Sequence, residues 1–230
     1  LISKDKSEKP IEDSAAPIRD MKGNINGVVL VFRDFTEKKE KHDRIEYLSF
    51  HDQLTGLYNR RYYEDNLAQL DKPQNLPLTI VMGDLNGLKL VNDSFGHELG
   101  DALLWKAAEV MKKGCRTDDI ISRIGGDEFV LIFPRTGAEE AAKIVERINS
   151  LAASEQAGSI SVSISFGIET KYAEVEKIQD TFKKAEDKMY KEKLFESPSM
   201  RAKTINTIIK TLQERSQREK EHSWKVSELC

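Results

Sequence analysis

The chain has 230 residues, of which 39% are hydrophobic and 33% charged, with a formal net charge of −3. This length suits one complete domain with partial flanking segments, and the slight acidic excess argues against a general nucleic-acid binder, which normally carries a basic surface. No apolar run approaches the ~20 residues of a membrane-spanning helix, and the two cysteines, Cys115 and Cys230, suit a reducing compartment. We therefore expect a cytoplasmic segment that binds no nucleic acid and makes no membrane contact of its own.

The chain opens on Leu1 within a polar stretch and stops at Cys230 within a helical pattern, so we expect a piece of a longer protein, which could itself be membrane-anchored. Residues 1–22 are polar and mostly unpatterned, with Pro10 and Pro17 as breakers, and turn residues 23–27 precede an apolar run at 28–32 that predicts a strand.

Residues 36–50 are rich in charge and predict a linker helix that Thr36 could cap. Its charges are interpreted as a solvated face, with a partner-binding role as the alternative.

From residue 52 the apolar pattern becomes dense, and helices alternate with strands. Helices are predicted at 58–70, 99–111, 138–153 and 178–194, and strands at 78–82, 120–121, 129–133 and 160–164. The strand pair around residues 125–126 reads as a hairpin. This order predicts an α+β fold in a two-layer arrangement, followed at 200–229 by a separate exposed helix with no core of its own.

The sharpest motif is Gly-Gly-Asp-Glu-Phe at residues 125–129. Two glycines tolerate positive φ at a tight hairpin turn, and Asp127 and Glu128 would then lie at its exposed tip. Adjacent carboxylates repel one another, and a divalent cation relieves this. Magnesium suits such oxygen ligands and commonly uses one or two carboxylates plus substrate phosphates.

A further acid, Asp84, lies where the predicted strand 78–82 ends, a position at which α/β proteins often place ligands. The loop after it carries Gly87, Lys89 and Gly96, a composition that suits phosphate binding by backbone N–H groups. Alone, such a loop is usually a plain turn; together with the hairpin it predicts a nucleotide–metal site.

Several motifs together resemble one family. They are residues 52–60 (Asp-x-Leu-Thr-Gly-Leu-x-Asn-Arg), 84–101, 125–129, 165–168 and 185–193. In this order they make the segment from residue 50 to about 195 resemble a GGDEF domain, the domain of diguanylate cyclases. The resemblance implies a fold like the adenylyl cyclase palm: a mostly antiparallel central sheet flanked by helices, with a projecting hairpin that carries the GGDEF turn.

The resemblance also implies an activity. Each domain would bind one GTP, and two domains in a homodimer would meet to form cyclic di-GMP and two pyrophosphates, the 3′-hydroxyl of one GTP attacking the α-phosphate of the other. Asp84, Asp127 and the Leu85 carbonyl would hold Mg²⁺, with Mn²⁺ as an alternative metal. Asp127 would also accept the hydroxyl proton, and Glu128 would share in metal binding and catalysis.

Substrate contacts follow from the same resemblance. Asn92 and Asp101 would select guanine, since a carboxylate accepts from N1–H and the N2 amino group, and adenine has no donor at N1. Lys89 and Lys193 would contact phosphates. His97 is interpreted either as a substrate contact or as a residue that fixes the loop.

A product-inhibition site for cyclic di-GMP is also implied. Arg116 and Asp119 form an Arg-x-x-Asp motif shortly before Gly125, and Arg147 lies where the family has a second arginine. Arginine suits phosphate and the guanine edge. By itself Arg-x-x-Asp is usually a surface ion pair.

The flanks resemble other domains. Residues 1–36 resemble the end of a PAS sensor domain, 37–51 would be the linker helix, 52–196 the GGDEF domain, and 197–230 the helical start of an HD-GYP phosphodiesterase domain. This arrangement raises an alternative function: a catalytically weak module that binds GTP or cyclic di-GMP and controls a fused HD-GYP domain. Two departures from the family pattern are Asn86, where many active members have Asp, and residues 195–197, which replace a Gly-Arg-Asn ending.

Overall fold

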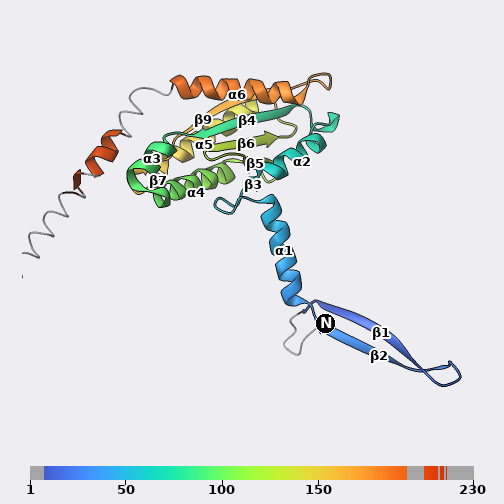
Figure 1. Ribbon diagram of the computed structural model, residues 1–230. Helices are drawn as coiled ribbons and strands as arrows, with labels where there is room; N and C mark the ends of the chain where they lie inside the picture. The colour runs from blue at the N-terminus through green and yellow to red at the C-terminus, as the bar shows by residue number, and fades with distance from the viewer. Residues whose placement is uncertain (1–7, 196–204, 212, 215, 217–230) are drawn as a thin grey trace, which may run out of the picture. The chain divides into compact units, whose positions relative to one another are not determined.

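The computed structural model describes residues 8–195, 205–211, 213, 214 and 216. The chain divides into two compact units, Leu1–Ser49 and Phe50–Cys230, which are described separately. The first unit contains an antiparallel hairpin of β1 (Ile11–Arg19) and β2 (Ile25–Asp34), followed by α1 (Thr36–Phe50), whose last residue belongs to the second unit (Figure 1).

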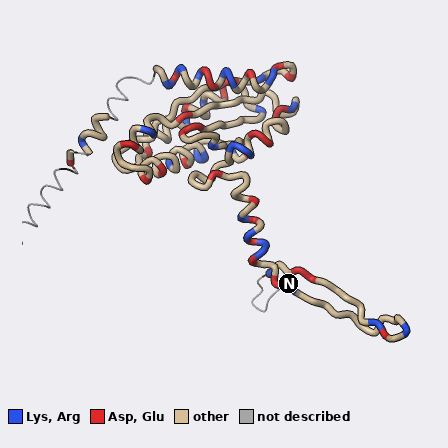
Figure 2. Tube along the Cα trace, viewed as in Figure 1, with Lys and Arg blue, Asp and Glu red and all other residues tan. Residues whose placement is uncertain are grey.

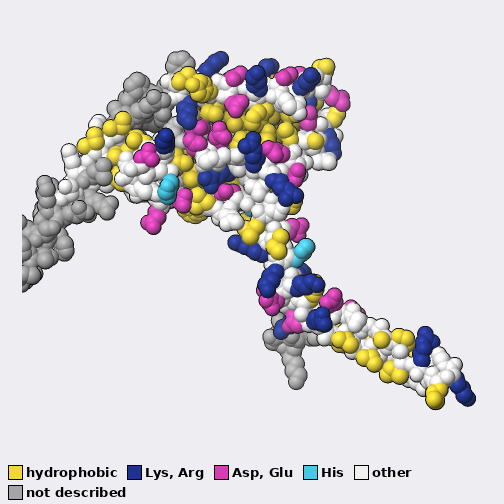
Figure 3. All heavy atoms as spheres, viewed as in Figure 1, with side chains coloured by type: hydrophobic (Ala, Val, Ile, Leu, Met, Phe, Trp, Pro, Cys, Tyr) yellow, Lys and Arg dark blue, Asp and Glu magenta, His cyan; other side chains and the backbone are white. Residues whose placement is uncertain are grey.

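The sequence does not predict strand β1, because residues 1–22 are polar and lack an alternating apolar pattern. Its order comes from pairing with β2, and Pro17 lies opposite Val28. Proline is tolerated in a strand with an open edge. The apolar run of β2 is about half-exposed, from 46% at Val29 to 57% at Val28, and hydrophobic side chains line this hairpin in Figure 3.

Helix α1 spans residues 36–50, as the sequence predicts for a helix. Lys and Arg alternate with Asp and Glu along it (Figure 2), and none of its residues is buried. The Thr36 N–H, at the start of the helix, donates to the carboxylate of Asp34 at 2.9 Å. The cap expected from Thr36 is therefore supplied by Asp34.

The second unit is built on a five-stranded sheet in the order β3-β5-β6-β4-β9. The strands are β3 (Tyr58–Asn59), β4 (Leu78–Leu85), β5 (Ile120–Arg123), β6 (Glu128–Phe133) and β9 (Ile164–Lys171). Only the short β3–β5 pairing is parallel within these described strands; the other pairings are antiparallel. The mostly antiparallel sheet and its hairpin are confirmed.

Helices cover both faces of the sheet. They are α2 (Arg60–Leu70), α3 (Leu88–Phe95), α4 (His97–Gly114), α5 (Ala138–Ser154) and α6 (Ile178–Phe195), with a short 3-10 turn at Pro73–Asn75 and a small hairpin of β7 (Gln156–Ala157) and β8 (Ile160–Ser161). Val81 packs with residues of α4 and α5, whereas its neighbours Ile80 and Met82 pack with residues of α6. The expected two-layer arrangement is therefore wrong: there are three layers (Figure 1). Strand β4 is buried on both faces and accordingly reads as a continuous apolar run.

Three other boundaries differ from expectation. Residues 58–59 form β3 instead of opening the helix, and the expected strand at 160–164 is divided between β8 and β9. Residues 205–211 are helical as predicted, but Ile208 is only 6% exposed and joins the core that contains Ile160 and Val162. The expectation that this helix has no core is thus wrong for its described part. Residues 213, 214 and 216 are helical as well, and the other residues of the helix predicted at 200–229 lie outside the described residues.

In the part of the chain that the structure describes, no helix combines the length and apolar character needed to span a membrane.

Candidate functional site

The site is organised around Asp84, near the end of β4. Its side chain is 6% exposed and lies opposite Glu128 of β6 and Ser165 of β9 in the strand registers. The ammonium of Lys193, on α6, donates to Asp84 Oδ2 at 2.7 Å and also lies 2.7 Å from the buried Oδ1. Burial raises the pKa of Asp84, and the charges of Asp127 and Glu128 add to the rise, whereas the ammonium of Lys193 opposes it.

The β5–β6 turn is fastened to the end of β4. The Leu85 N–H donates to the carbonyl of Asp127 at 2.9 Å, and Glu128 lies opposite Asp84 in the β4–β6 register. Both acids expected at the tip of the hairpin are thus held beside the strand that carries Asp84.

The glycines of this turn do not serve the purpose expected from the sequence. Neither Gly125 nor Gly126 has a positive φ. A Cβ on Gly125 would instead lie 2.5 Å from Glu128 Oε2, while one on Gly126 would meet nothing within 4 Å. Gly125 therefore makes room for the Glu128 side chain to fold back over the turn.

Carboxylate oxygens at this site are suited to a divalent cation. Both oxygens of the buried Asp84 carboxylate lie 2.7 Å from the Lys193 ammonium, so this carboxylate already holds a positive charge, and hard cations prefer oxygen ligands. Within the described residues, however, no group of three or more His, Cys, Asp or Glu side chains is arranged to hold a metal ion. The donors fit a site of one or two carboxylates that substrate phosphates would complete, which is the usual arrangement for Mg²⁺.

The segment after β4 is a helix rather than the expected open loop. Gly87, with φ of +75°, turns the chain directly from β4 into α3. Asn92 of α3 lies against α4: a Cβ on Gly100 would lie only 1.9 Å from Asn92 Oδ1, an oxygen that is buried without a hydrogen bond. Lys89, His97 and Asp101 lie on these two helices and are exposed.

This arrangement matches known proteins. The family model described as diguanylate cyclase, GGDEF domain, matches residues 49–199. The chain belongs to this family.

Curated relatives carry names of the GGDEF family. The probable diguanylate cyclase DgcE of Escherichia coli K12 is 39% identical over 140 residues, which are 60% of this chain and 13% of DgcE. Response regulator PleD of Caulobacter vibrioides is 34% identical over 155 residues, 64% of this chain and 34% of PleD. Diguanylate cyclase DgcM of E. coli K12 is 29% identical over 194 residues, 82% of this chain and 46% of DgcM. The chain thus spans less than half the length of each of these relatives.

Solved GGDEF structures have the same fold. Diguanylate cyclase SiaD from Pseudomonas aeruginosa, solved with its activator SiaC, aligns with a TM-score of 0.59 at 27% identity, covering 68% of this chain and 63% of SiaD. The GGDEF domain of DgcB from Caulobacter crescentus, solved with c-di-GMP, aligns with a TM-score of 0.58 at 25% identity, covering 63% of this chain and 90% of that domain.

Arg123 is a residue of the GGDEF hairpin that sequence reasoning missed. Its guanidinium donates to the carbonyl of Gly126 at 2.8 Å and to the carboxylate of Asp52 at 3.1 Å. Asp52 also accepts the N–H and hydroxyl of Thr55. Burial alone would raise the pKa of Asp52, but the Thr55 hydrogen bonds and the Arg123 charge lower it. Arg123 therefore ties the GGDEF turn to the first motif of the domain, and its position two residues before Gly125 was the signal available in the sequence.

The departure at Asn86 has a structural explanation. The side-chain oxygen of Asn86 accepts a hydrogen bond from the Ser165 hydroxyl at 3.0 Å, and its amide group donates to the Ser163 hydroxyl at 3.1 Å. It fastens the end of β4 to the start of β9.

The three residues expected to form a product-inhibition site lie near the C-terminal end of α4. The Arg116 N–H donates to the Asp119 carboxylate at 2.7 Å, the Arg116 carbonyl accepts from the Asp119 N–H at 3.2 Å, and the Arg116 guanidinium pairs with Glu140. Arg147 donates to the carbonyl of Gly114 at 2.6 Å. Burial raises the pKa of Asp119, which the charges of Arg116 and Arg147 oppose. The structure thus brings the three side chains into one neighbourhood.

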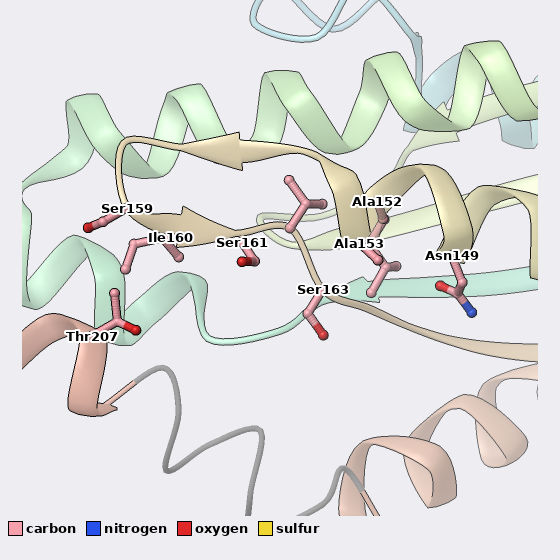
Figure 4. A pocket seen from close by; sticks show the side chains of 10 residues that line it. Asn149, Ala152, Ala153, Ser159, Ile160, Ser161, Ser163 and Thr207 are labelled. Atoms are coloured by element: carbon pink, nitrogen blue, oxygen red, sulfur yellow. The ribbon is translucent and has the colours of Figure 1, made fainter.

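A separate cavity of about 360 Å³ lies between α5, β8 and the helix at 205–211 (Figure 4). Ser159, Ser161, Ser163 and Thr207 contribute hydroxyl groups to its wall, and none of its described lining residues is charged. It therefore lacks the groups that would bind a triphosphate and its metal.

Proposed function

We propose that the chain is a diguanylate cyclase, which condenses two GTP molecules into cyclic di-GMP and two pyrophosphates at a Mg²⁺-dependent site shared by the GGDEF domains of two copies. The observation that carries the proposal is the buried carboxylate of Asp84, held opposite Glu128 and in contact with Lys193, within the segment that matches the family.

The roles of the acids follow from their places. Asp84, Asp127, Glu128 and the Leu85 carbonyl are the proposed metal ligands, with Mn²⁺ as an alternative metal. A bound divalent cation would polarise the α-phosphate and stabilise the leaving pyrophosphate. Asp127 would accept the proton of the attacking 3′-hydroxyl, and the bond between its carbonyl and the Leu85 N–H would keep it beside β4.

The substrate contacts are assigned to the two helices after β4 and to α6. Asn92 and Asp101 would bind the guanine edge, and Lys89 and Lys193 the phosphates. His97, the exposed first residue of α4, would either contact substrate or fix the start of that helix.

Regulation by product is proposed for Arg116, Asp119 and Arg147. The pairing of Arg116 with Glu140 would have to open for cyclic di-GMP to bind, which costs little at an exposed ion pair.

The flanking assignments remain proposals. Residues 1–36 would end a PAS-like domain, which would explain the exposed apolar strands of the hairpin; 37–51 would link it to the GGDEF domain at 52–196. Most of the HD-GYP-like segment at 197–230 lies outside the described residues.

The proposal is tested by incubating the full chain with GTP and Mg²⁺ and separating the nucleotides by chromatography. We expect cyclic di-GMP and pyrophosphate, with a specific activity that rises with protein concentration because two copies share the site. A chain that stays dimeric at the assay concentration and forms no cyclic di-GMP would contradict the proposal.

A binding module is the second candidate, motivated by the HD-GYP-like segment expected at 197–230. Such a module would bind GTP or cyclic di-GMP and control a fused phosphodiesterase. Calorimetry distinguishes the two: affinity for either nucleotide without turnover favours the module, and no affinity for both removes it.

Replacing Arg123 by lysine should lower the rate of GTP conversion by about 10- to 100-fold, because a small misplacement of reacting groups carries a cost of that order. Lysine keeps the charge but cannot bridge Gly126 and Asp52 with one planar group. The measurement is kcat at saturating GTP.

The matched control for this variant is Arg135→Lys. Arg135 pairs with Asp118 on the surface, with exposed fractions of 56% and 75%, so kcat should be unchanged. Equal activity of the two variants would show that Arg123 does not position the turn.

Replacing Gly100 by alanine should weaken GTP binding by roughly tenfold or more, because the new methyl group occupies the place of Asn92 Oδ1 and displaces a proposed guanine ligand, whose unmet hydrogen bonds are costly. The dissociation constant of GTP is measured by calorimetry.

The control is a double-mutant cycle with Asn92→Ala. In that background the overlap with Asn92 is gone and Leu88 Cδ1, at 3.2 Å, is the tight contact that remains, so Gly100→Ala should destabilise the chain far less than it does in the wild type. If the alanine destabilises both backgrounds equally, Asn92 is not what requires glycine at this position.

A further inference from the structure

Lys193 and Asp84 form an ion pair at the point where a metal ion is proposed to bind. The two residues come from α6 and β4, and Lys193 Nζ lies 2.7 Å from Asp84. The side chains differ in environment: that of Asp84 is 6% exposed and that of Lys193 is 36% exposed. The acid is therefore fixed in the protein, while the amine lies at the boundary with solvent.

The ammonium compensates a charge that the fold would otherwise leave buried. Removing an ionised carboxylate from water is expensive unless an opposite charge is close, and the other ionised groups that act on Asp84 include two acids, Asp127 and Glu128. Lys193 thus supplies, at this carboxylate, the positive charge that a metal ion would supply when bound.

From this geometry we propose that Lys193 holds Asp84 in the metal-free protein and must leave it before a divalent cation can bind there, so that cation and nucleotide bind cooperatively. The proposal rests on the assignment of Asp84 as a metal ligand in the proposed function. It adds a second role to Lys193, as a residue that keeps the cation site closed in the absence of substrate.

The exchange is physically feasible. A lysine side chain is a compact charge on a flexible stem, and Lys193 lies in the last turn of α6, so its ammonium can move without unfolding the helix. Phosphate groups offer an alternative partner for the ammonium and additional oxygen ligands for the cation. Each ligand therefore removes an obstacle to the other, and by linkage the effect is reciprocal.

The proposal predicts that neutralising Lys193 tightens binding of Mn²⁺ alone. We expect Lys193→Met and Lys193→Gln to raise the affinity of the full chain for Mn²⁺ by at least about fivefold without nucleotide, the lower end of typical coupling between sites. Free Mn²⁺ is measured by electron paramagnetic resonance. In the wild type, addition of a non-hydrolysable GTP analogue should raise Mn²⁺ affinity; in both variants this enhancement should shrink.

Two controls make the test specific. Lys188→Met removes a lysine of the same helix that pairs with Glu169 at 2.6 Å and should leave Mn²⁺ affinity unchanged. Asp84→Asn should abolish the gain when combined with Lys193→Gln. Lys193→Met leaves a buried acid unpaired and could be unstable. Lys193→Gln retains a hydrogen-bond donor, so it serves as the test variant in that case. The readout is then the rise in melting temperature that Mn²⁺ induces.

The outcomes separate this proposal from the proposed function. Unchanged or weaker Mn²⁺ binding in the Lys193 variants overturns the proposal, even if the wild type makes cyclic di-GMP. Tighter Mn²⁺ binding supports it, even if no turnover is found. Absence of Mn²⁺ binding in every variant overturns it together with the metal site.

Discussion

Replacing Asp84 by asparagine should lower the rate of GTP conversion by at least about 10²-fold, while the melting temperature stays the same or rises. The rate falls because the site loses a preorganised charge, and effects of this size are typical of such losses. Stability does not fall because asparagine fills the same space without a buried charge. Burial raises the pKa of this carboxyl, and the Lys193 ammonium, whose side chain is 36% exposed, can return to solvent.

The sign of the stability change follows from the pKa. A carboxyl whose pKa is raised by folding is less stable as an anion in the folded than in the unfolded chain, so its ionisation lowers the free energy of unfolding at neutral pH. Asparagine removes that cost, and the difference from wild type should shrink as the pH falls through the pKa of Asp84. The measurements are product formation and thermal unfolding at two pH values.

A second lysine–carboxylate pair gives the matched control. Lys171 pairs with Asp71, but there the lysine is the buried partner, 4% exposed, and the acid is 23% exposed. Asp71→Asn leaves a buried ammonium without its counter-charge and should destabilise the chain by about 3 kcal/mol, with kcat unchanged at temperatures where it is folded. If Asp84→Asn behaved in the same way, Asp84 would be a structural acid and not part of the site.

Much of the central domain could be predicted from the sequence because its signals are local. The apolar run that became β4 and the hairpin around Gly125 are visible as patterns of a few residues. Strand β1 was missed because its order depends on β2. The burial of Ile208 was missed because it depends on a core whose other members, such as Val162, lie far back in the chain. Pairing and packing at long range leave little trace in local composition.

The same distinction applies to the site. The motifs predicted a shared site for Asp127, Glu128 and Asp84, and the structure brings the three residues together through the β4–β6 register and the bond from the Leu85 N–H to the Asp127 carbonyl. The ion pair between Asp84 and Lys193 joins residues 109 apart in sequence, and the reason for glycine at position 125 is a close approach by Glu128. Neither could be read from spacing, because both depend on where side chains come to rest in the fold.

Among the glycines of the domain, Gly167 should be the one whose replacement by alanine lowers the free energy of unfolding most. A Cβ at this position would lie 2.0 Å from the carbonyl oxygen of Ala185 and 2.2 Å from the amide nitrogen of Met189. Both are backbone atoms of α6, so no side-chain rotation can relieve the overlap, and α6 must move away from β9. That movement opens the core in which Ala185 and Met189 are buried. We expect Gly167→Ala to cost about 3 kcal/mol or more, at or above the upper end for overpacking, and to lower the melting temperature by about 6–12 °C.

Gly137→Ala is the control, because a Cβ there would meet only ordinary contacts, at 3.8 Å from Tyr172 and 4.0 Å from Pro77. Its stability should stay within about 1 kcal/mol of wild type. The Gly167 variant has a second expected consequence: since Lys193 reaches Asp84 from α6, displacement of that helix should also weaken GTP binding in molecules that remain folded. A melting temperature equal to that of Gly137→Ala would show that α6 does not lie this close to β9, and the contact between Lys193 and Asp84 would lose its structural basis.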